Sequence, residues 1–303
     1  MVRPQKRKRR RLGRTRSAWP LAIGFMPAAR RCVPTRRCNS RHRIKQNNDY
    51  DMTKRLTILT ILLTLFLCLN AGGKRILFIG DSITDGGWGN SGGSAKPSDK
   101  RTHWDLNHIY GHSYMFLCAA HYQAEYPEKG YEFFNRGISG NTLNDLEKRW
   151  DTDVLALKPD VLSVLIGTND VDVFLRNGGK DFDIADWEAR YRALLDTALA
   201  QNPDLRIVLG APFVACTGKM RKSGNYAERE RTVRLCAAAV KRIAHDYNAI
   251  YLPYDVMFAK TIGKTHGVSD TYWIWDGIHP TAAGHRLMSD LWIKNADKSR
   301  VMR

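Results

Sequence analysis

The chain has 303 residues, with 48 lysine and arginine residues against 30 aspartate and glutamate residues, and its formal net charge is +18 at pH 7. The excess lies in residues 1–51, which carry 16 basic and 2 acidic residues, whereas residues 74–303 carry 30 and 28. A protein that binds nucleic acid through surface charge needs basic residues on its folded part, so the balance of residues 74–303 argues against that class.

Two interpretations of residues 1–51 are open. A basic arm can bind nucleic acid or an anionic membrane. This arm, however, has little apolar periodicity and lacks the aromatic interleaving of a nucleic-acid-binding segment, which is more typical of disorder or of sequence upstream of the true start. We adopt the second interpretation because the residues after Met52 have the organisation of a new N-terminus.

Residues 52–73 have the pattern of a signal peptide. Residues 53–55 (TKR) form a basic region, residues 56–69 form an apolar run, and the small residues at 70–73 (NAGG) offer a cleavage site. The apolar run is shorter than the ~20 residues that a membrane-spanning helix needs. We therefore expect cleavage near residues 72–74, no permanent membrane span, and a secreted or periplasmic mature protein.

From residue 74 onward, short β-branched runs alternate with longer amphipathic stretches, which is the pattern of βαβ units around a parallel sheet. Five strands are predicted, at Arg75–Gly80, Tyr131–Asn135, Val161–Gly167, Arg206–Ala211 and Ala249–Leu252. Helices are predicted at about 112–126, 142–157, 185–201, 225–247 and 281–294.

Continuously apolar strands such as VLSVLIG at 161–167 indicate a sheet that is buried on both faces. We therefore predict an α/β fold, a three-layer α/β/α sandwich with a five-stranded parallel sheet, in one domain at 74–296 with a tail at 297–303. Ligands bind such sheets at the carboxyl ends of the strands.

The cysteines of this domain, Cys118, Cys216 and Cys236, are odd in number and lack CxxC spacing, which argues against a disulfide framework and a zinc site.

The first strand ends in GDSITD (80–85), which places Ser82 at the carboxyl edge of the sheet. A lone serine there is more often a helix N-cap than a nucleophile. The segment WDGIHP (275–280) changes that balance, because Asp276 stands three residues before His279 and ahead of the last helix. His279 would accept the proton of the weakly nucleophilic serine hydroxyl, and Asp276 would fix the imidazole tautomer and stabilise its charge. We predict these three residues as catalytic.

Two turns rich in glycine and asparagine follow the next strands, SGNT at 139–142 and GTND at 167–170. Taken singly, each is typical of an ordinary turn. An acyl-transfer enzyme must also stabilise the oxyanion of a tetrahedral intermediate, and N–H groups are uncharged donors for it. We therefore predict an oxyanion hole formed by the backbone N–H groups of Ser82 and Gly140 and the side-chain amide of Asn169.

With these motifs the sequence resembles the SGNH/GDSL hydrolase superfamily, whose four blocks are represented here by GDSIT, GISGNT, IGTND and DGIHP. The resemblance implies a flavodoxin-like α/β/α fold. It also implies the same site: Ser82 as nucleophile and oxyanion donor, Gly140 and Asn169 as further donors, His279 as the base and Asp276 as its partner.

Within that superfamily the sequence is most similar to the bacterial acetylxylan esterases, over about residues 74–296, and it departs from them at 88–108, which borders the expected site. The superfamily cleaves acetylated sugars, phospholipids, thioesters and other esters, so the fold cannot choose among substrates. The loops at 86–105 and 176–183 are polar, unlike the apolar groove or lid of a long-chain lipase. A short acyl group on a carbohydrate is therefore favoured.

Four tryptophans lie in predicted loops near the motifs, namely Trp88, Trp104, Trp273 and Trp275. Flat aromatic faces suit the C–H faces of sugar rings, so we predict these residues as substrate-binding. The alternative is that they are packing anchors, because tryptophan is mostly buried on average.

Taken together, the sequence predicts a serine esterase that removes acetyl groups from carbohydrate esters, with acetylated xylan or xylo-oligosaccharide as the substrate. The reaction needs no cofactor, and the histidine spacings contain no metal-binding motif such as HExxH. Two alternatives stay open: a lipase or lysophospholipase-type acylhydrolase of the same superfamily, and a non-catalytic carbohydrate-binding protein. We expect no nucleic-acid partner for the mature domain, and a homo-oligomer is compatible with the resemblance.

Overall fold

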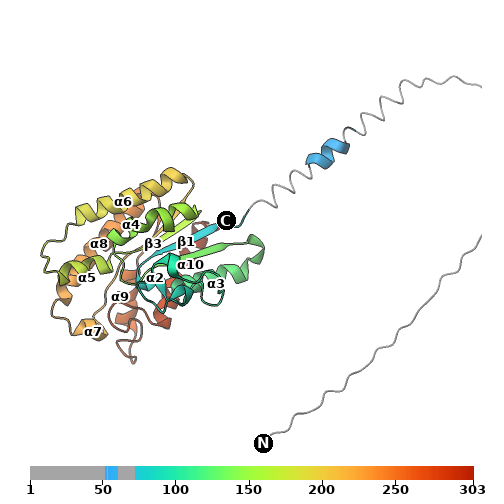
Figure 1. Cartoon of the computed structure of the whole chain (residues 1–303). Helices are drawn as coiled ribbons and strands as arrows, with labels where there is room; N and C mark the ends of the chain where they lie inside the picture. The colour runs from blue at the N-terminus through green and yellow to red at the C-terminus, as the bar shows by residue number, and fades with distance from the viewer. Residues whose placement is uncertain (1–51, 53, 61–71) are drawn as a thin grey trace, which may run out of the picture. The chain divides into compact units, whose positions relative to one another are not determined.

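The structure, a computed structural model, describes residues 52, 54–60 and 72–303 (Figure 1). The chain divides into two units, Met1–Phe66 and Leu67–Arg303. In the first unit residues 52 and 54–60 are helical, and the predictions for residues 1–51 and for most of the signal peptide lie outside the described residues. Across the described ranges, none of the helices has both the length and the apolar character needed to cross a membrane.

The second unit is built on a five-stranded parallel sheet, as the sequence predicted. Its strands are β1 (Arg75–Gly80), β2 (Glu132–Gly137), β3 (Val161–Leu165), β4 (Arg206–Gly210) and β5 (Ile250–Leu252). They lie in the order β2-β1-β3-β4-β5, so the direction of strand succession reverses at β1. At such a reversal the loops at the carboxyl ends of the strands diverge and leave a crevice for a ligand.

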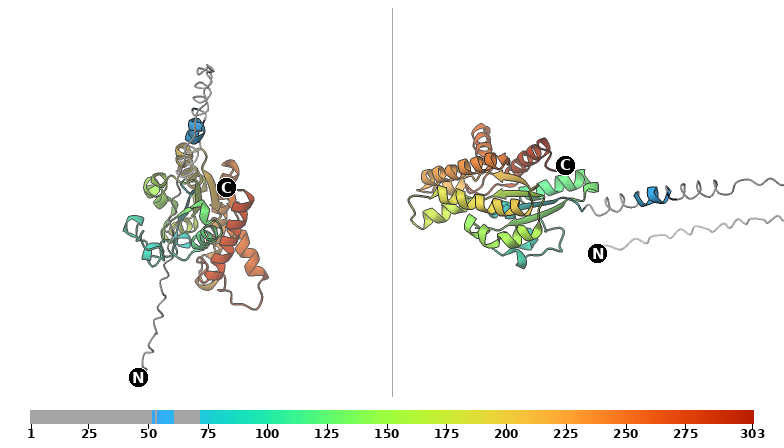
Figure 2. Two further views of the ribbon diagram at one scale, coloured as in Figure 1. Left: turned by 90° about the vertical axis from the view of Figure 1, so that its right-hand side faces the viewer. Right: turned by 90° about the horizontal axis from the view of Figure 1, so that it is seen from above.

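Helices cover both faces of this sheet, and the left view of Figure 2 shows α10 (red) and α4 (green) on opposite sides of it. The helices are α2 (Ser82–Asp85), α3 (Tyr114–Glu125), α4 (Leu143–Asp153), α5 (Thr168–Arg176), α6 (Ile184–Gln201), α7 (Gly218–Arg221), α8 (Tyr226–Asp246), α9 (Tyr254–Lys264) and α10 (Ala282–Lys298). One face packs on α3, α9 and α10, and the other on α4, α6 and α8. The predicted three-layer α/β/α sandwich is therefore confirmed.

Strand β1 is apolar at successive positions because both of its faces are buried. Ile76 and Phe78 belong to the core under α3 and α10, whereas Leu77 and Ile79 belong to the core under α4 and α6. Since side chains alternate between the faces of a strand, a central strand with helices on both sides needs apolar residues throughout.

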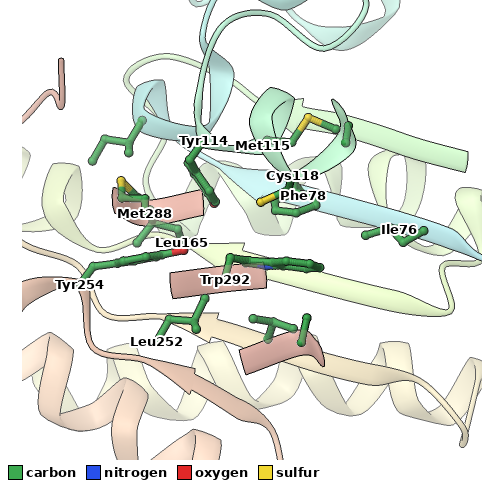
Figure 3. Packing of buried hydrophobic residues seen from close by; sticks show 14 of the residues in the cluster. Ile76, Phe78, Tyr114, Met115, Cys118, Leu165, Leu252, Tyr254, Met288 and Trp292 are labelled. Carbon is green, nitrogen blue, oxygen red and sulfur yellow. The ribbon is translucent and has the colours of Figure 1, made fainter. Parts of the chain in front are cut away.

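Trp292 of α10 lies at the centre of one of these cores (Figure 3). It is fully buried, and its ring centroid lies 5.1 Å from that of Phe78 in β1. Its indole N–H donates a hydrogen bond of 3.1 Å to the hydroxyl of Ser163 in β3, which explains how a polar residue is tolerated inside an apolar strand. Burial of a large apolar side chain contributes about 1.5–3 kcal/mol, so this packing holds β1 and β3, and the loops that follow them, in a fixed arrangement.

The last residues belong to the folded unit, which corrects the tail predicted at 297–303. Val301 and Met302 are buried. The Tyr131 hydroxyl donates a hydrogen bond of 2.5 Å to the Met302 carbonyl, and Lys74 Nζ donates one of 3.2 Å to the Val301 carbonyl. Two apolar residues at the end of a charged sequence carry no periodic signal, so the sequence did not reveal this packing.

Several element boundaries also differ from the predicted ones. The third strand ends at 165 rather than 167 because α5 begins at Thr168, and neither α5 nor α9 was predicted. Helix α5 is short and starts with Thr-Asn-Asp, which is typical of a turn. Helix α9 follows Pro253 directly after a strand of three residues, so the two elements merge in the sequence pattern.

Candidate active site

Ser82 follows β1 as the first residue of the single-turn helix α2. Asp81 caps this turn, because its carboxylate accepts a hydrogen bond of 2.9 Å from the backbone N–H of Ile83. Gly80 allows β1 to lie close to β3, since a Cβ at Gly80 would lie 2.3 Å from the carbonyl oxygen of Leu165. The close approach of these strands fixes the point at which the chain turns and presents Ser82 at the carboxyl edge of the sheet.

The Ser82 hydroxyl meets the imidazole of His279. Ser82 Oγ lies 2.8 Å from His279 Nε2, although the two residues are 197 positions apart. On the other side of the ring, Nδ1 lies 2.9 Å from Asp276 Oδ2. The other carboxylate oxygen accepts hydrogen bonds of 3.0 and 2.8 Å from the backbone N–H groups of Ile278 and His279. The carboxylate therefore fixes both the ring and the backbone of its loop.

The loop that carries Asp276 and His279 is anchored to the chain that follows β4. Ile274 and Pro280 pair across the base of the loop in an antiparallel bridge. The Ala215 N–H donates a hydrogen bond of 2.8 Å to the Gly277 carbonyl, and the Thr217 hydroxyl donates one of 2.7 Å to the Ile274 carbonyl. These contacts fix the position of the loop and therefore of the His279 imidazole. No motif in the sequence indicated them.

The hydrogen bonds of this site shift the pKa values of its members. Burial alone would raise the pKa of Asp276, but hydrogen bonds from the His279 ring and from two backbone N–H groups lower it to about 2. The hydrogen bond to Asp276 raises the pKa of His279 above its ordinary value, against the effect of burial. Burial raises the pKa of Asp81 to about 7. Asp276 is therefore ionised at neutral pH and stabilises the protonated imidazole.

The predicted oxyanion donors lie on the loops after β1, β2 and β3, and β1 lies between the other two strands. Gly140 lies in the turn after β2 with a φ of 83°, and Asn169 lies in the first turn of α5. The Asn169 amide donates a hydrogen bond of 3.1 Å to the Asn141 carbonyl, which links these two loops. Within the part of the chain that the structure describes, the backbone N–H groups of Ser82 and Gly140 donate to no protein acceptor, so both are available to an anionic oxygen.

The structure corrects part of the prediction for the tryptophans. Trp88 is fully buried and its indole N–H donates a hydrogen bond of 2.7 Å to the Gly137 carbonyl, so it is a packing anchor that no sugar can reach. Trp273 is half-buried and its indole N–H donates a hydrogen bond of 3.3 Å to the Thr265 hydroxyl, whereas Trp104 is 83% exposed. Trp275 differs from these, because the residue is 49% exposed and its ring centroid lies 6.3 Å from that of His279.

Arg149 of α4 is a contact residue that the sequence did not reveal. Its guanidinium donates hydrogen bonds of 3.2 Å to the Gly80 carbonyl and 2.8 Å to Asn141 Oδ1, so it ties the end of β1 to the turn after β2. An arginine in the charged stretch LEKRWD is typical of a solvent-facing helix surface. One feature of the sequence could have indicated this contact. Arg149 stands three residues after Leu146, which is buried, and so lies on the side of the helix that faces the sheet.

A parallel α/β sheet with a serine, a histidine and an aspartate in one chain of hydrogen-bond contacts at its carboxyl edge has the architecture of a serine hydrolase. The chain belongs to the GDSL-like lipase/acylhydrolase family, whose profile matches residues 78–287. It is therefore a carboxylic ester hydrolase, and the resemblance seen in the four motifs is confirmed.

Individual relatives agree with this membership. The chain is 33% identical over 229 residues to an acetylxylan esterase of Geobacillus stearothermophilus. The aligned region covers 73% of this chain and 93% of that protein. The crystal structure of an acetylxylan esterase from that organism aligns with a TM-score of 0.57 at 30% identity, over 74% of this chain and 94% of the other. A GDSL-like lipase from Parabacteroides merdae aligns with a TM-score of 0.63 at 29% identity, over 75% and 96%.

Proposed function

We propose that this protein is a serine esterase that removes acetyl groups from carbohydrate esters, with acetylated xylan or xylo-oligosaccharide as its substrate. The observation that carries the proposal is the pair of contacts, 2.8 and 2.9 Å long, that joins Ser82 through His279 to Asp276. The similarity to an acetylxylan esterase and the exposed ring of Trp275 beside His279 support the carbohydrate as the alcohol part of the ester.

In the first half of the reaction, Ser82 Oγ attacks the carbonyl carbon of the acetyl ester while His279 Nε2 accepts the hydroxyl proton. The carbonyl oxygen becomes an oxyanion, which receives hydrogen bonds from the backbone N–H groups of Ser82 and Gly140 and from the Asn169 amide. When the carbon–oxygen bond to the sugar breaks, His279 donates its proton to the departing sugar oxygen. The acetyl group stays on Ser82 as an ester.

In the second half, a water molecule takes the place of the sugar. His279 accepts a proton from that water as its oxygen attacks the acetyl carbonyl carbon, and the same donors bind the second oxyanion. Acetate leaves as the bond to Ser82 Oγ breaks, and His279 returns the proton to that oxygen. Asp276 keeps the imidazole in the tautomer with a proton on Nδ1 in the resting state.

Solved structures of the Geobacillus acetylxylan esterase support these roles. Two of them are described as catalytic mutants, one changed at an aspartate and the other at a histidine three positions later. Asp276 and His279 have the same spacing in this chain. We assign the corresponding roles to these two residues on that basis and on their contact with Ser82.

Acid release from a panel of esters tests the proposed substrate. Acetylated xylan and xylo-oligosaccharides are expected to release acetate faster than acetylated chitin or acetylated pectin does, and faster than a phospholipid releases fatty acid. A preference for the phospholipid would instead favour a lipase-type acylhydrolase. No turnover of any ester by a pure, folded sample would favour a non-catalytic carbohydrate-binding protein.

The pH dependence of hydrolysis is expected to follow the ionisation of His279. The imidazole acts as a base only when it is neutral, and its pKa is raised above the ordinary value of 6.5. The kcat/KM for p-nitrophenyl acetate should therefore rise with pH along a single-proton limb whose midpoint lies above 6.5. Below the midpoint the rate should fall about tenfold per pH unit. A limb with its midpoint below about 6 would contradict the assigned role of Asp276.

Replacing Asn169 with alanine is expected to lower kcat by ~10²–10³-fold, because the change removes one oxyanion donor. The KM for p-nitrophenyl acetate should change little, since the amide acts mainly on the charge that develops in the transition state. Asn177→Ala, at the exposed C-terminal end of the same helix, is the matched control and should keep wild-type activity. An Asn169→Ala enzyme within about threefold of wild type would remove this residue from the site.

We also propose that the protein is exported, on the basis of the basic, apolar and small-residue regions of residues 52–73. N-terminal sequencing of the protein isolated from its native source should find a start near residues 72–74. Finding residues 1–51 on the exported protein would contradict this proposal.

A further inference from the structure

The loop at 86–108 contains a fully buried arginine, although its composition is polar and rich in glycine. The side chain of Arg101 has an exposed fraction of 0%, and so has its partner Asp85. A buried guanidinium needs an opposite charge and acceptors for its N–H groups. Arg101 makes a two-pronged contact with Asp85, with Nη1 2.5 Å from Oδ1 and Nη2 3.1 Å from Oδ2.

The remaining N–H groups of Arg101 organise the loop around it. They donate hydrogen bonds of 2.8 Å to the Lys96 carbonyl, 3.0 Å to the Ser94 carbonyl and 3.0 Å to Ser91 Oγ. The guanidinium carbon lies 4.7 Å from the ring centroid of the buried Trp88, a cation–π distance. The loop is therefore wrapped around one side chain, and that side chain holds it against the end of β1.

Asp85 connects the Arg101 loop to the predicted oxyanion hole. The Asp85 oxygen that faces Arg101 Nη2 also accepts hydrogen bonds of 2.8 Å from both the backbone N–H and the hydroxyl of Ser139. Asp85 ends the helical turn that starts with Ser82, and Ser139 directly precedes Gly140. One buried carboxylate thus joins the turn of the proposed nucleophile to the turn of an oxyanion donor.

On its other side the Gly140 turn is held through Asn141, whose carbonyl accepts a hydrogen bond from the Asn169 amide and whose Oδ1 accepts one from Arg149. Gly140 itself is not packed, because no heavy atom of a described residue outside its two chain neighbours lies within 4 Å of where a Cβ on Gly140 would be. Its φ of 83° is set by the backbone on either side and not by packing. The direction of its N–H therefore depends on the hydrogen bonds made by Ser139 and by Asn141, whose N–H donates 3.2 Å to the Ile138 carbonyl.

We propose that Arg101 is a positioning residue that acts through Asp85 and Ser139 to aim the Gly140 N–H at the oxyanion. The proposal rests on the proposed function, since it concerns the donor set of the same reaction. It assigns the loop at 86–108 a role in transition-state stabilisation. Arg101 touches no reacting atom and acts through the Gly140 N–H, which binds the oxyanion that forms in the transition state. Its effect is therefore expected on kcat and not on substrate binding.

The test is the turnover of p-nitrophenyl acetate per active site, with sites counted by fluorophosphonate titration. Arg101→Lys keeps a positive charge but cannot make the two-pronged contact. Its kcat per titrated site should fall about tenfold or more, with KM within about twofold of wild type. Ser139→Ala loses the hydroxyl bond to Asp85 but keeps the N–H bond, so its kcat should fall less. Arg192→Met, which removes an ion pair with Glu188 and Asp246, is the control and should leave kcat unchanged.

An Arg101→Lys enzyme with wild-type kcat per titrated site overturns the proposal, whatever its thermal stability. A raised KM with unchanged kcat also overturns it, because the loop would then act on substrate binding. Should Arg101→Lys yield no folded protein, an unchanged kcat in Ser139→Ala overturns it. A wild-type protein that hydrolyses no ester would instead refute the proposed function, and with it this inference.

Discussion

Replacing Ser82 with alanine is expected to lower kcat/KM for p-nitrophenyl acetate by at least ~10⁴-fold, because no acyl-enzyme can form without the attacking oxygen. The residual rate would come from the oxyanion donors acting on a water molecule that His279 activates. The fold should be retained, since among the residues that the structure describes the hydroxyl makes one hydrogen-bond contact, with His279. Losing such a contact costs about 1 kcal/mol, so the melting temperature should change little.

The matched control for this change is Ser299→Ala, which makes the same substitution at an exposed position at the C-terminal end of α10. It should keep wild-type activity. A pure Ser82→Ala sample that retains activity within about tenfold of wild type would contradict the assignment of the nucleophile.

Replacing Asp276 with asparagine is expected to lower kcat by ~10⁴-fold, although the two side chains have nearly the same shape. The asparagine carbonyl can still accept the backbone hydrogen bonds that Asp276 Oδ1 receives from Ile278 and His279. Its NH2 group, however, would face His279 Nδ1 and force the imidazole into the tautomer with a proton on Nε2. That nitrogen could then no longer accept the proton of Ser82.

A second readout separates this explanation from simple damage to the loop. Because the hydrogen bond and the charge of Asp276 raise the pKa of His279, the asparagine variant should show its acid limb at a lower pH than wild type. Asp270→Asn, which weakens an exposed ion pair with Arg221 in the same segment, should leave both kcat and the pH profile unchanged. Wild-type kcat in Asp276→Asn would remove this carboxylate from the mechanism.

The fold was predictable because its strands are buried on both faces. Segments such as VLSVLIG are too apolar for a half-exposed sheet, and each is separated from the next by enough residues for a crossover helix. The longer helices that were missed, α5 and α9, begin with residues that are typical of turns or follow a very short strand. Their helical structure depends on packing, such as that of Phe258 of α9 in the core, and tertiary packing is not visible in local periodicity.

Some residues of the candidate site were predictable from the sequence and others were not. Ser82 and His279 could be assigned to one site because each motif follows a recognisable strand or precedes a recognisable helix. Arg101 and Thr217 carried no such signal, since their partners include backbone carbonyls or side chains that meet them only once the loops have folded. Trp88 was assigned to the substrate because the sequence shows that it follows β1, but not that its loop folds inward.

The central claim is that the hydroxyl of Ser82 is activated by His279 at the carboxyl edge of the sheet. The most direct measurement is to treat the protein with a fluorophosphonate and locate the modified residue by peptide mass spectrometry. We expect one adduct per chain, on Ser82, with loss of esterase activity in proportion to labelling and no adduct in His279→Ala. Stoichiometric labelling at another serine, or labelling of Ser82 that leaves activity intact, would contradict it.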